Sequence, residues 1–266
     1  MEKLIFINFF IFLISLPSYA QNINGIINYS LTVLSDTLHD VELTQNATLF
    51  INMEEKKSLY VTRRETDNES VKAPKFTYKK DGSYSIKSTE KPVDKIGELT
   101  YKNHITKELV CRDFISDKSF IVTDDYPIIQ WEIKDAKKMI LNFNCQKAEG
   151  DFRGRHYTAW FTDKILIPDG PWKLCGLPGL ILEAYDEKKH ILFELQTVDI
   201  PKNFNEIIQV PNEGESINFT DFYVKQKNSN KAAVKRFLAK TGDLDANISV
   251  SSNLVEATKL ERNIQE

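Results

Sequence analysis

The chain has 266 residues, of which 41% are hydrophobic and 27% charged, and its formal net charge is −3 at pH 7. At about 100–200 residues per domain, this length allows one large domain or two small ones, with enough apolar residues for a core. The near balance of 35 basic and 38 acidic residues is unlike the basic footprint of a nucleic-acid binder, so the composition argues against a nucleic-acid partner.

The first twenty residues have the pattern of a cleavable secretory signal. Lys3 gives a positive start, residues 4–16 are almost entirely apolar, Pro17 ends that run, and Ala20 is the small residue expected before the cleavage point. A membrane span needs about 20 apolar residues, and neither this run nor any later segment is long enough. We therefore expect an exported protein that is not integral to the membrane.

Three cysteines, Cys111, Cys145 and Cys175, occur in this exported chain. In an oxidising compartment the simplest arrangement is one disulfide and one remaining thiol, although the sequence does not identify the pair. We favour Cys111 with Cys145, because Cys175 lies in a tight segment rich in glycine and proline. The chain has no Cys-x-x-Cys spacing, which argues against a thioredoxin-type redox role.

Short apolar stretches alternate with polar turns in the first half of the chain, as is typical of antiparallel strands. The clearest hairpin has strands at 75–78 and 84–87 around Asp81-Gly82, a pair that readily takes the positive φ of a tight turn. Residues 63–73 form a polar interruption that we expect to be an exposed loop. The other strands expected in this half are 26–34, 47–53, 58–62, 99–101, 108–114 and 119–123.

The second half continues the strand pattern. We expect a strand at 138–145, a turn at Glu149-Gly150-Asp151, and a further strand at 153–162. A last hairpin joins 181–185 to 191–198, where apolar and polar side chains alternate, so one face of that strand should lie on the core.

Helical periodicity is confined to the C-terminal region. Asp221 can cap a short helix, which Gly242 would end, and residues 243–266 have the composition of a loose polar tail. The sequence thus predicts a mainly β protein. Its fold would be a single curved antiparallel sheet, half-barrel-like, with one or two short C-terminal helices.

The most specific part of the chain is residues 145–186, which contain Arg-Gly-Arg at 153–155 and Gly-Pro-Trp-Lys at 170–173. They also contain the hexapeptide Gly176, Leu177, Pro178, Gly179, Leu180 and Ile181. On these residues the chain resembles the GLPGLI family of Bacteroidetes envelope proteins. The resemblance implies an exported β protein of the Gram-negative envelope, often encoded near TonB-dependent outer-membrane receptors, and it supplies no catalytic residues.

With this resemblance, the chain divides into three parts. These are a signal peptide at 1–20, a GLPGLI-type β domain at 21–242 and the polar tail at 243–266. Within the hexapeptide, glycine and proline favour a tight turn around which the leucines and isoleucine are buried. Asp169-Gly170-Pro171 is a second turn just before Trp172. Two such turns flanking an aromatic residue make either a rigid corner of the core or a presented binding edge, and we favour the corner.

Arg153, Arg155 and His156 form the most distinctive polar cluster. On one strand the two arginines would point the same way, about 7 Å apart, which suits a carboxylate or phosphate. The alternative is structural pairing with Asp or Glu on a neighbouring strand. Trp160 and Trp172 complete the candidate ligand- or partner-binding residues, with burial in the core as their alternative.

Standard catalytic and cofactor motifs are missing from the sequence. There is no HExxH, GxSxG, GxxxxGK[ST] or GxGxxG, and the histidines lack zinc-site spacing, so we expect no cofactor or metal and assign no catalytic residue. The one enzymatic arrangement that the residue types allow is a Cys175 nucleophile with His156 or His190 as its general base.

The sequence therefore favours a non-enzymatic periplasmic binding or accessory protein. Its expected partner is an outer-membrane receptor or another envelope protein, in a transport or receptor system. One alternative is a carrier of a small apolar or peptide ligand held in the concave sheet. The other is a hydrolase.

Overall fold

The computed structural model describes residues 24–34, 40–64, 75–78, 84–89 and 93–241. The expected signal peptide at 1–20, the tail at 243–266 and most of the polar loop expected at 63–73 lie outside the described residues. The strands are β1 (Asn24–Leu34), β2 (Asp40–Asn52), β3 (Lys57–Thr62), β4 (Lys75–Tyr78), β5 (Tyr84–Thr89), β6 (Glu98–Asn103), β7 (Glu108–Ile115), β8 (Lys118–Asp125), β9 (Glu132–Ile140), β10 (Phe143–Phe152), β11 (Arg155–Thr162), β12 (Leu180–Asp186), β13 (Ile191–Asp199) and β14 (Glu215–Asn218).

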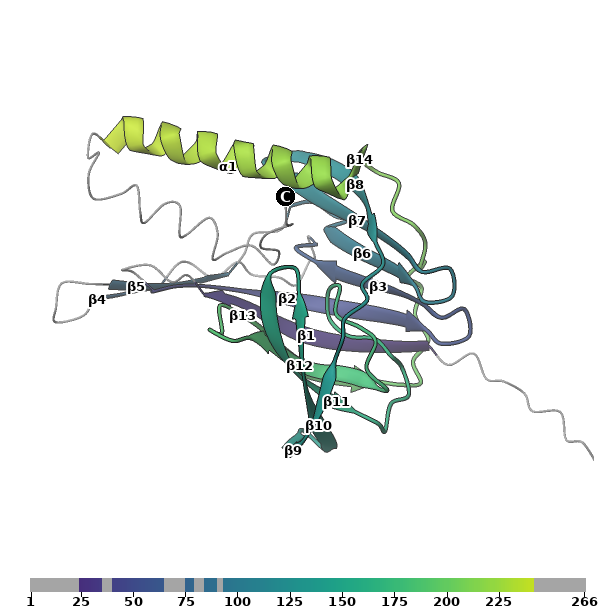
Figure 1. Ribbon diagram of the computed structural model, residues 1–266. Helices are drawn as coiled ribbons and strands as arrows, with labels where there is room; N and C mark the ends of the chain where they lie inside the picture. The colour runs from purple at the N-terminus through teal and green to yellow at the C-terminus, as the bar shows by residue number, and fades with distance from the viewer. Residues whose placement is uncertain (1–23, 35–39, 65–74, 79–83, 90–92, 242–266) are drawn as a thin grey trace, which may run out of the picture.

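These strands form one sheet in the order β14-β8-β7-β6-β3-β2-β1-β13-β12-β11-β10-β9, with β5 and β4 branching from β2. The pairs are antiparallel except β14 with β8 and β2 with β5. The end strands β14 and β9 do not pair with each other, so the sheet is open. Figure 1 shows that it is strongly curved. The expectation of a mainly β protein built on a single curved sheet is confirmed.

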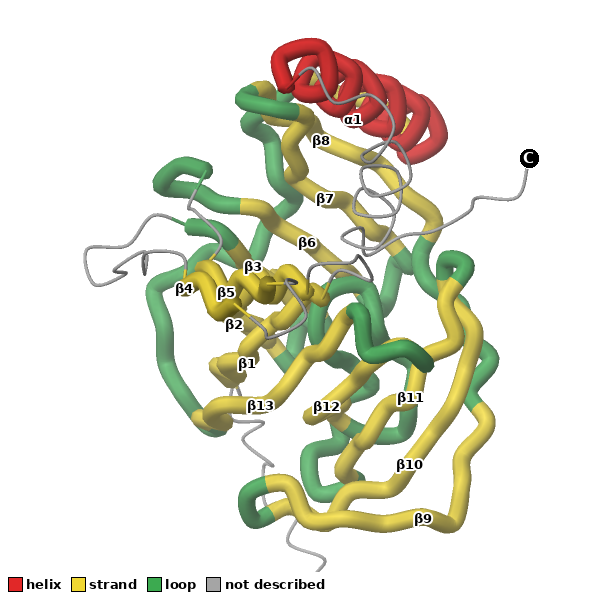
Figure 2. The backbone as a smooth tube through the Cα atoms, turned by 90° about the vertical axis from the view of Figure 1, so that its left-hand side faces the viewer, coloured by secondary structure: helices red, strands yellow, loops and turns green. Residues whose placement is uncertain are grey.

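The described chain has a single helix, α1 (Phe219–Thr241), and at 23 residues it is longer than we expected. The side chain of Asn218 accepts a hydrogen bond from the backbone N–H of Asp221 at 2.8 Å, so Asn218, and not Asp221, caps the helix. Asp221 lies in the first turn, where a negative charge interacts favourably with the helix dipole. Figure 2 shows α1 lying beside β8 at one end of the sheet.

The strand boundaries between 132 and 155 differ from the prediction. The strand expected at 138–145 is instead the hairpin between β9 and β10, which turns at Leu141 with a φ of 48°. The turn expected at Glu149-Gly150-Asp151 lies inside β10. Gly150 is needed there for close packing, since a Cβ at this position would lie 3.0 Å from the Trp131 ring.

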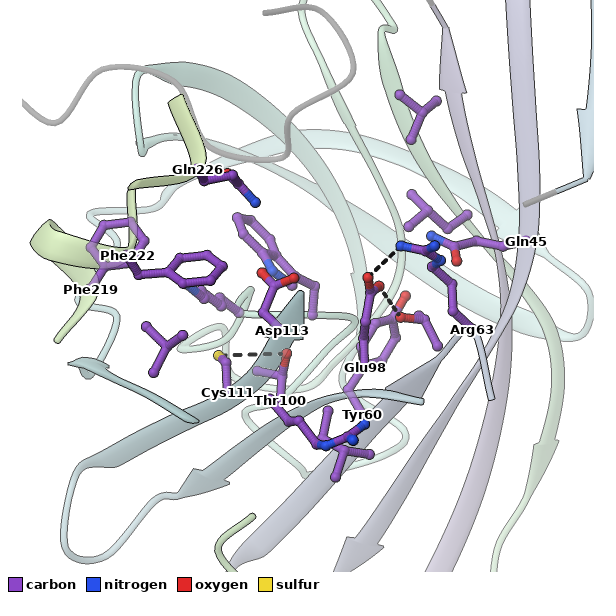
Figure 3. A pocket seen from close by; sticks show the side chains of 18 of the residues that line it. Gln45, Tyr60, Arg63, Glu98, Thr100, Cys111, Asp113, Phe219, Phe222 and Gln226 are labelled. Carbon is purple, nitrogen blue, oxygen red and sulfur yellow. Dashed lines mark hydrogen bonds and ion pairs between the residues drawn. The ribbon is translucent and has the colours of Figure 1, made fainter. Parts of the chain in front are cut away.

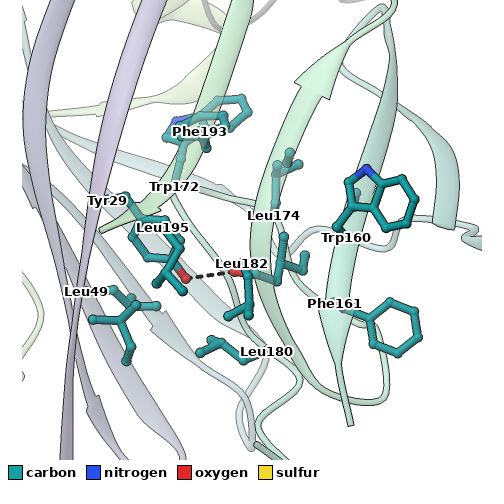
Figure 4. Packing of buried hydrophobic residues seen from close by; sticks show 14 of the residues in the cluster. Tyr29, Leu49, Trp160, Phe161, Trp172, Leu174, Leu180, Leu182, Phe193 and Leu195 are labelled. Atoms are coloured by element: carbon teal, nitrogen blue, oxygen red, sulfur yellow. Dashed lines mark hydrogen bonds between the residues drawn. The ribbon is translucent and has the colours of Figure 1, made fainter. Parts of the chain in front are cut away.

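The main core lies between β1, β2 and β11–β13, and the segment that leads into β12 fills it. Tyr29 is 1% exposed, and its hydroxyl donates a hydrogen bond to the carbonyl of Ile181 at 2.7 Å, which ties β1 to the end of the hexapeptide. Figure 4 shows this bond among the leucine, phenylalanine and tryptophan side chains of the core. A separate cluster lies under α1, where Phe219 and Phe222 pack on side chains of β7 and β8.

The preference for a disulfide between Cys111 and Cys145 was wrong. All three cysteines are buried as thiols, with Cys111 in the cluster under α1 and Cys145 in the main core. The two belong to β7 and β10, which are far apart in the strand order, so their thiols are held in different apolar surroundings. Burial raises the pKa of Cys145 to about 11, so it stays protonated at neutral pH.

Candidate ligand-binding site

A pocket of about 230 Å³ lies between β1, β2, β3, β6, β7 and β8 on one side and the start of α1 on the other. In Figure 3, Phe219, Phe222 and Gln226 of α1 face Gln45 of β2 and Arg63 across this space. The apolar part of the lining includes Leu31, Val33, Leu43, Trp172, Phe219 and Phe222. The polar part includes Gln45, Tyr60, Arg63, Glu98, Arg112 and Asp113.

Each cation of the lining is paired with a carboxylate. Arg63 donates to Glu98 at 2.7 Å, and the hydroxyl of Thr62 donates to the other oxygen of Glu98 at 3.1 Å. Arg112 pairs with Asp94, and Lys173 pairs with Asp124, both at 2.7 Å. Charge is therefore largely balanced around the pocket.

Tyr60 is the most unusual group of the lining. Its side chain is 2% exposed, and its hydroxyl has no hydrogen-bond partner among the described residues. The side-chain oxygen of Gln45, in the same lining, is likewise buried without a partner in that part of the chain. Burial, and then the charge of Glu98, raise the pKa of Tyr60, so the phenol keeps its proton. Leaving a buried polar group unpaired costs about 1–3 kcal/mol.

The wall beside α1 is held by an ion-pair cluster. Asp124 at the end of β8 binds Arg153 at 2.5 Å and Lys173 at 2.7 Å, and its side chain is only 2% exposed. Both cations also lie over the Phe219 ring, at 4.1 and 4.6 Å from its centroid. This cluster joins β8, near one end of the sheet, to the turn between β10 and β11, near the other end.

The two arginines of the expected binding cluster do not act together. Arg153 lies in the β10–β11 turn with a φ of 50°, where it meets Asp124. Arg155, on β11, is 4% exposed and binds Asp186 of the neighbouring strand β12 at 2.5 Å. The shared anion site is thus not formed, because the two residues are not on one strand, and Arg155 has the structural pairing that was the alternative.

The remaining candidates also separate. His156 is exposed and lies 2.7 Å from Asp151 on the adjacent strand. Trp160 is 9% exposed in the main core, with Lys138 4.5 Å above its ring. Trp172 is the candidate that lines the pocket, where it adjoins Lys173. Sequence reasoning did not identify Tyr60 and Gln45, because Tyr60 looks like an ordinary residue of the expected strand 58–62 and Gln45 precedes the one expected at 47–53.

The hexapeptide forms a corner of the core, as we favoured. Leu177, Leu180 and Ile181 are each at most 1% exposed. Gly176 has a φ of 96°, which favours glycine, and the indole N–H of Trp131 donates to the preceding carbonyl at 2.9 Å. At Gly179 a Cβ would lie 2.0 Å from the carbonyl oxygen of Thr162, so only glycine fits. The motif therefore stabilises the fold beside the pocket without lining it.

A buried polar network that the sequence did not indicate connects this corner to β6. The fully buried Lys102 forms an ion pair with Asp169 and donates to the carbonyl of Gly170 at 3.0 Å. His104 Nε2 lies 2.9 Å from the other oxygen of Asp169. Burial alone would raise the pKa of Asp169, but Lys102 and His104 outweigh it and hold that pKa well below its usual range.

Cys175 lies at the edge of this network, not beside the bases proposed for it. Its sulfur is 3.7 Å from the hydroxyl of Tyr126, and burial raises the pKa of the thiol. His156 binds Asp151, and His190 lies 3.6 Å from Asp186. The thiol–imidazole arrangement drawn from the sequence is thus not formed.

The described residues contain no group of three or more His, Cys, Asp or Glu side chains placed to hold a metal ion. No helix within the same part of the chain has the length and apolar character needed to cross a bilayer.

Residues 152–183 match the family model Porph_ging, described as a protein of unknown function. No curated protein matches the chain. Among solved structures, PNGF-II in its P21 and C2 crystal forms is similar, with TM-scores of 0.50 and 0.51 and 14% identity. The likeness covers 78% of this chain but only 34% and 33% of those chains, so it concerns about a third of PNGF-II and shows the fold alone. An uncharacterized conserved protein from Thermus thermophilus is similar at a TM-score of 0.35 and 10% identity, over 72% of this chain and 90% of that one.

Proposed function

We propose that this chain is a non-enzymatic binding protein of the cell envelope that holds a small ligand in the pocket between the curved sheet and α1. The observation that carries the proposal is the buried hydroxyl of Tyr60 in the lining of that pocket, which has no hydrogen-bond partner among the residues that the structure describes. Buried polar groups in folded proteins nearly always have a partner. A ligand that bonds to this hydroxyl would remove the unfavourable free energy of leaving it unpaired.

The shape of the site also supports binding. Side chains from six strands and one helix line the pocket, and the Asp124 cluster fixes the wall that carries Phe219. Ligand sites are typically mostly apolar, with a few convergent polar groups. A carrier needs a cavity in the concave sheet lined by Phe, Trp and Leu, and the lining of this pocket includes all three residue types. We therefore prefer the carrier function to partner binding.

The place of action rests on the sequence. The signal at 1–20 and the resemblance to the GLPGLI family support export to the periplasm or envelope and service to an outer-membrane transport or receptor system. The match of residues 152–183 to a family of unknown function is compatible with that resemblance. A carrier that collects a small ligand for a receptor would join the two roles.

Partner binding is a second candidate, favoured by the free side of β9. Among the described strands, β9 pairs with β10 alone, and Ile133 and Met139 on it are 47% and 58% exposed. An unpaired strand edge can receive an extended segment of another protein. The partner would then be held by backbone hydrogen bonds along β9.

Both candidates can be tested on protein purified under mild conditions from cells expressing the full chain. Native mass spectrometry is expected to find a small molecule that leaves when the protein is denatured, with a tagged unrelated envelope protein as the control. Cross-linking in intact cells before purification identifies any receptor attached through β9. A protein that carries no ligand but is cross-linked to one receptor would contradict the carrier function and favour the accessory one.

A further inference from the structure

We propose, resting on the binding function above, that the pocket takes a small uncharged molecule that presents hydroxyl or amide hydrogen-bond donors to Tyr60 and Gln45 and an aromatic or apolar face to Trp172 and Phe222. Three properties of the lining determine this chemical class: its volume, its charge balance and its unpaired polar atoms.

The volume indicates the size of ligand that fits inside the pocket. A dry cavity of about 150 Å³ is enough to hold benzene. The pocket, at about 230 Å³, therefore accommodates one six-membered ring and a small substituent. Trp172 and Phe222 provide flat surfaces against which such a ring can pack.

The charge balance disfavours an ion. Arg63, Arg112 and Lys173 already bind Glu98, Asp94 and Asp124 at 2.7 Å each. An anionic ligand would have to compete with these carboxylates for the same N–H groups. A cationic ligand would meet two carboxylates that already accept hydrogen bonds. Arg63 and Thr62 donate to Glu98, and the backbone N–H of Phe114 donates to Asp113 at 2.6 Å. An ion that entered the pocket would thus lose its hydration shell without gaining equally favourable contacts.

The unpaired atoms specify hydrogen bonds that the ligand must supply. The Gln45 side-chain oxygen accepts hydrogen bonds, and the Tyr60 hydroxyl both donates and accepts. A ligand with a donor that reaches Gln45 and a hydroxyl or amide that reaches Tyr60 would pair both atoms. A purely apolar ligand would leave both groups unpaired, so the pocket should discriminate against it.

The test uses four probes of similar size: benzamide, ethylbenzene, benzoate and benzylammonium. The tryptophans at 131, 160 and 172 are the chain's three, and Trp172 is the one that lines the pocket, so its indole N–H signal in a two-dimensional ¹H–¹⁵N spectrum reports binding there. Trp131 and Trp160 serve as internal controls. Benzamide is expected to shift the Trp172 signal selectively and to bind more tightly than either charged probe.

Two variants test the recognition itself. Tyr60→Phe and Gln45→Met keep the side-chain volume and each remove one polar group, so each should weaken benzamide about three- to tenfold and leave ethylbenzene unchanged or tighter. Equal effects on benzamide and ethylbenzene, or tighter binding of a charged probe, would overturn the ligand class while leaving the pocket as a binding site. If no probe shifts Trp172, both the class and the pocket are refuted. The comparison of probes on the unaltered protein stands even if a variant does not fold.

Discussion

Asp124 at the end of β8 and Arg153 in the turn between β10 and β11 form an ion pair of 2.5 Å that connects strands near opposite ends of the sheet. Lys173 binds the same carboxylate, and both cations lie over the ring of Phe219 at the start of α1. An open sheet can change its curvature, whereas one joined across its ends is restrained. The pair therefore holds the shape of the concave face and with it the pocket.

Asp124→Asn should lower the free energy of unfolding by about 3–5 kcal/mol, because it leaves two largely buried cations without their carboxylate. Chemical denaturation measures this loss. The neighbouring Asp125 is exposed, so Asp125→Asn is the matched control and should change stability by less than about 0.5 kcal/mol. Equal effects of the two substitutions would show that the cluster does not restrain the sheet.

Tyr60→Phe should make the ligand-free protein more stable by about 1 kcal/mol, since it removes a buried hydroxyl that has no partner in the described chain. Tyr29→Phe is the matched comparison, because the hydroxyl of Tyr29 donates to Ile181 at 2.7 Å. That substitution should destabilise the protein by about 1–3 kcal/mol, as it leaves a buried carbonyl without its donor. Thermal and chemical unfolding distinguish the two signs, and a loss of stability in Tyr60→Phe would mean that its hydroxyl is already satisfied.

The acid sensitivity of folding should depend on Asp169. Its pKa in the folded protein lies below the unfolded value of about 3.9, so its contribution to stability is present above that value and is lost as the pH falls through the folded pKa. The free energy of unfolding should thus decrease below about pH 5, and more steeply in the unaltered protein than in Asp169→Asn.

The measurement is denaturant unfolding from about pH 7 down to about pH 3, which reaches the range in which carboxylates titrate. Asp169→Asn should also lose about 3–5 kcal/mol at neutral pH, because Lys102 stays buried without its counter-charge. Asp163 is exposed, and Asp163→Asn should keep the steep acid dependence. An unaltered acid slope in Asp169→Asn would place the responsible carboxylate elsewhere.

Much of the sheet could be predicted because the order of apolar and polar residues within a strand indicates which of its faces is buried. In β13, Ile191, Phe193 and Leu195 share one face and are buried, whereas Leu192 is half-buried and Glu194 and Gln196 are exposed on the other face, as that alternation predicts. Gly150 was misread for the opposite reason. Glycine is required at position 150 because the Trp131 ring packs closely against it. The residues next to Gly150 in the sequence do not indicate this contact, since Trp131 lies on another segment.

The site was harder to predict than the fold, because it is made by distant parts of the chain. Gln45 and Tyr60 come from the first strands, whereas Trp172 and Phe222 follow more than a hundred residues later. Lys102 and Asp169 are 67 residues apart, and nothing in either local pattern indicates the other. Arg153 and Arg155 looked like a pair only because the start of the strand was placed at 153 and not at 155.

The two glycines of the hexapeptide should respond differently to alanine. At Gly179 the new Cβ would lie 2.0 Å from the backbone oxygen of Thr162, which cannot move without disturbing β11, so Gly179→Ala should cost about 3 kcal/mol or more. At Gly176 the nearest atoms lie 3.9 Å away and only the positive φ is unfavourable, so Gly176→Ala should cost about 1 kcal/mol. Chemical denaturation of the two variants gives the comparison. Losses in the reverse order would contradict the corner role of the motif, because close contact with β11 would then not be what Gly179 provides.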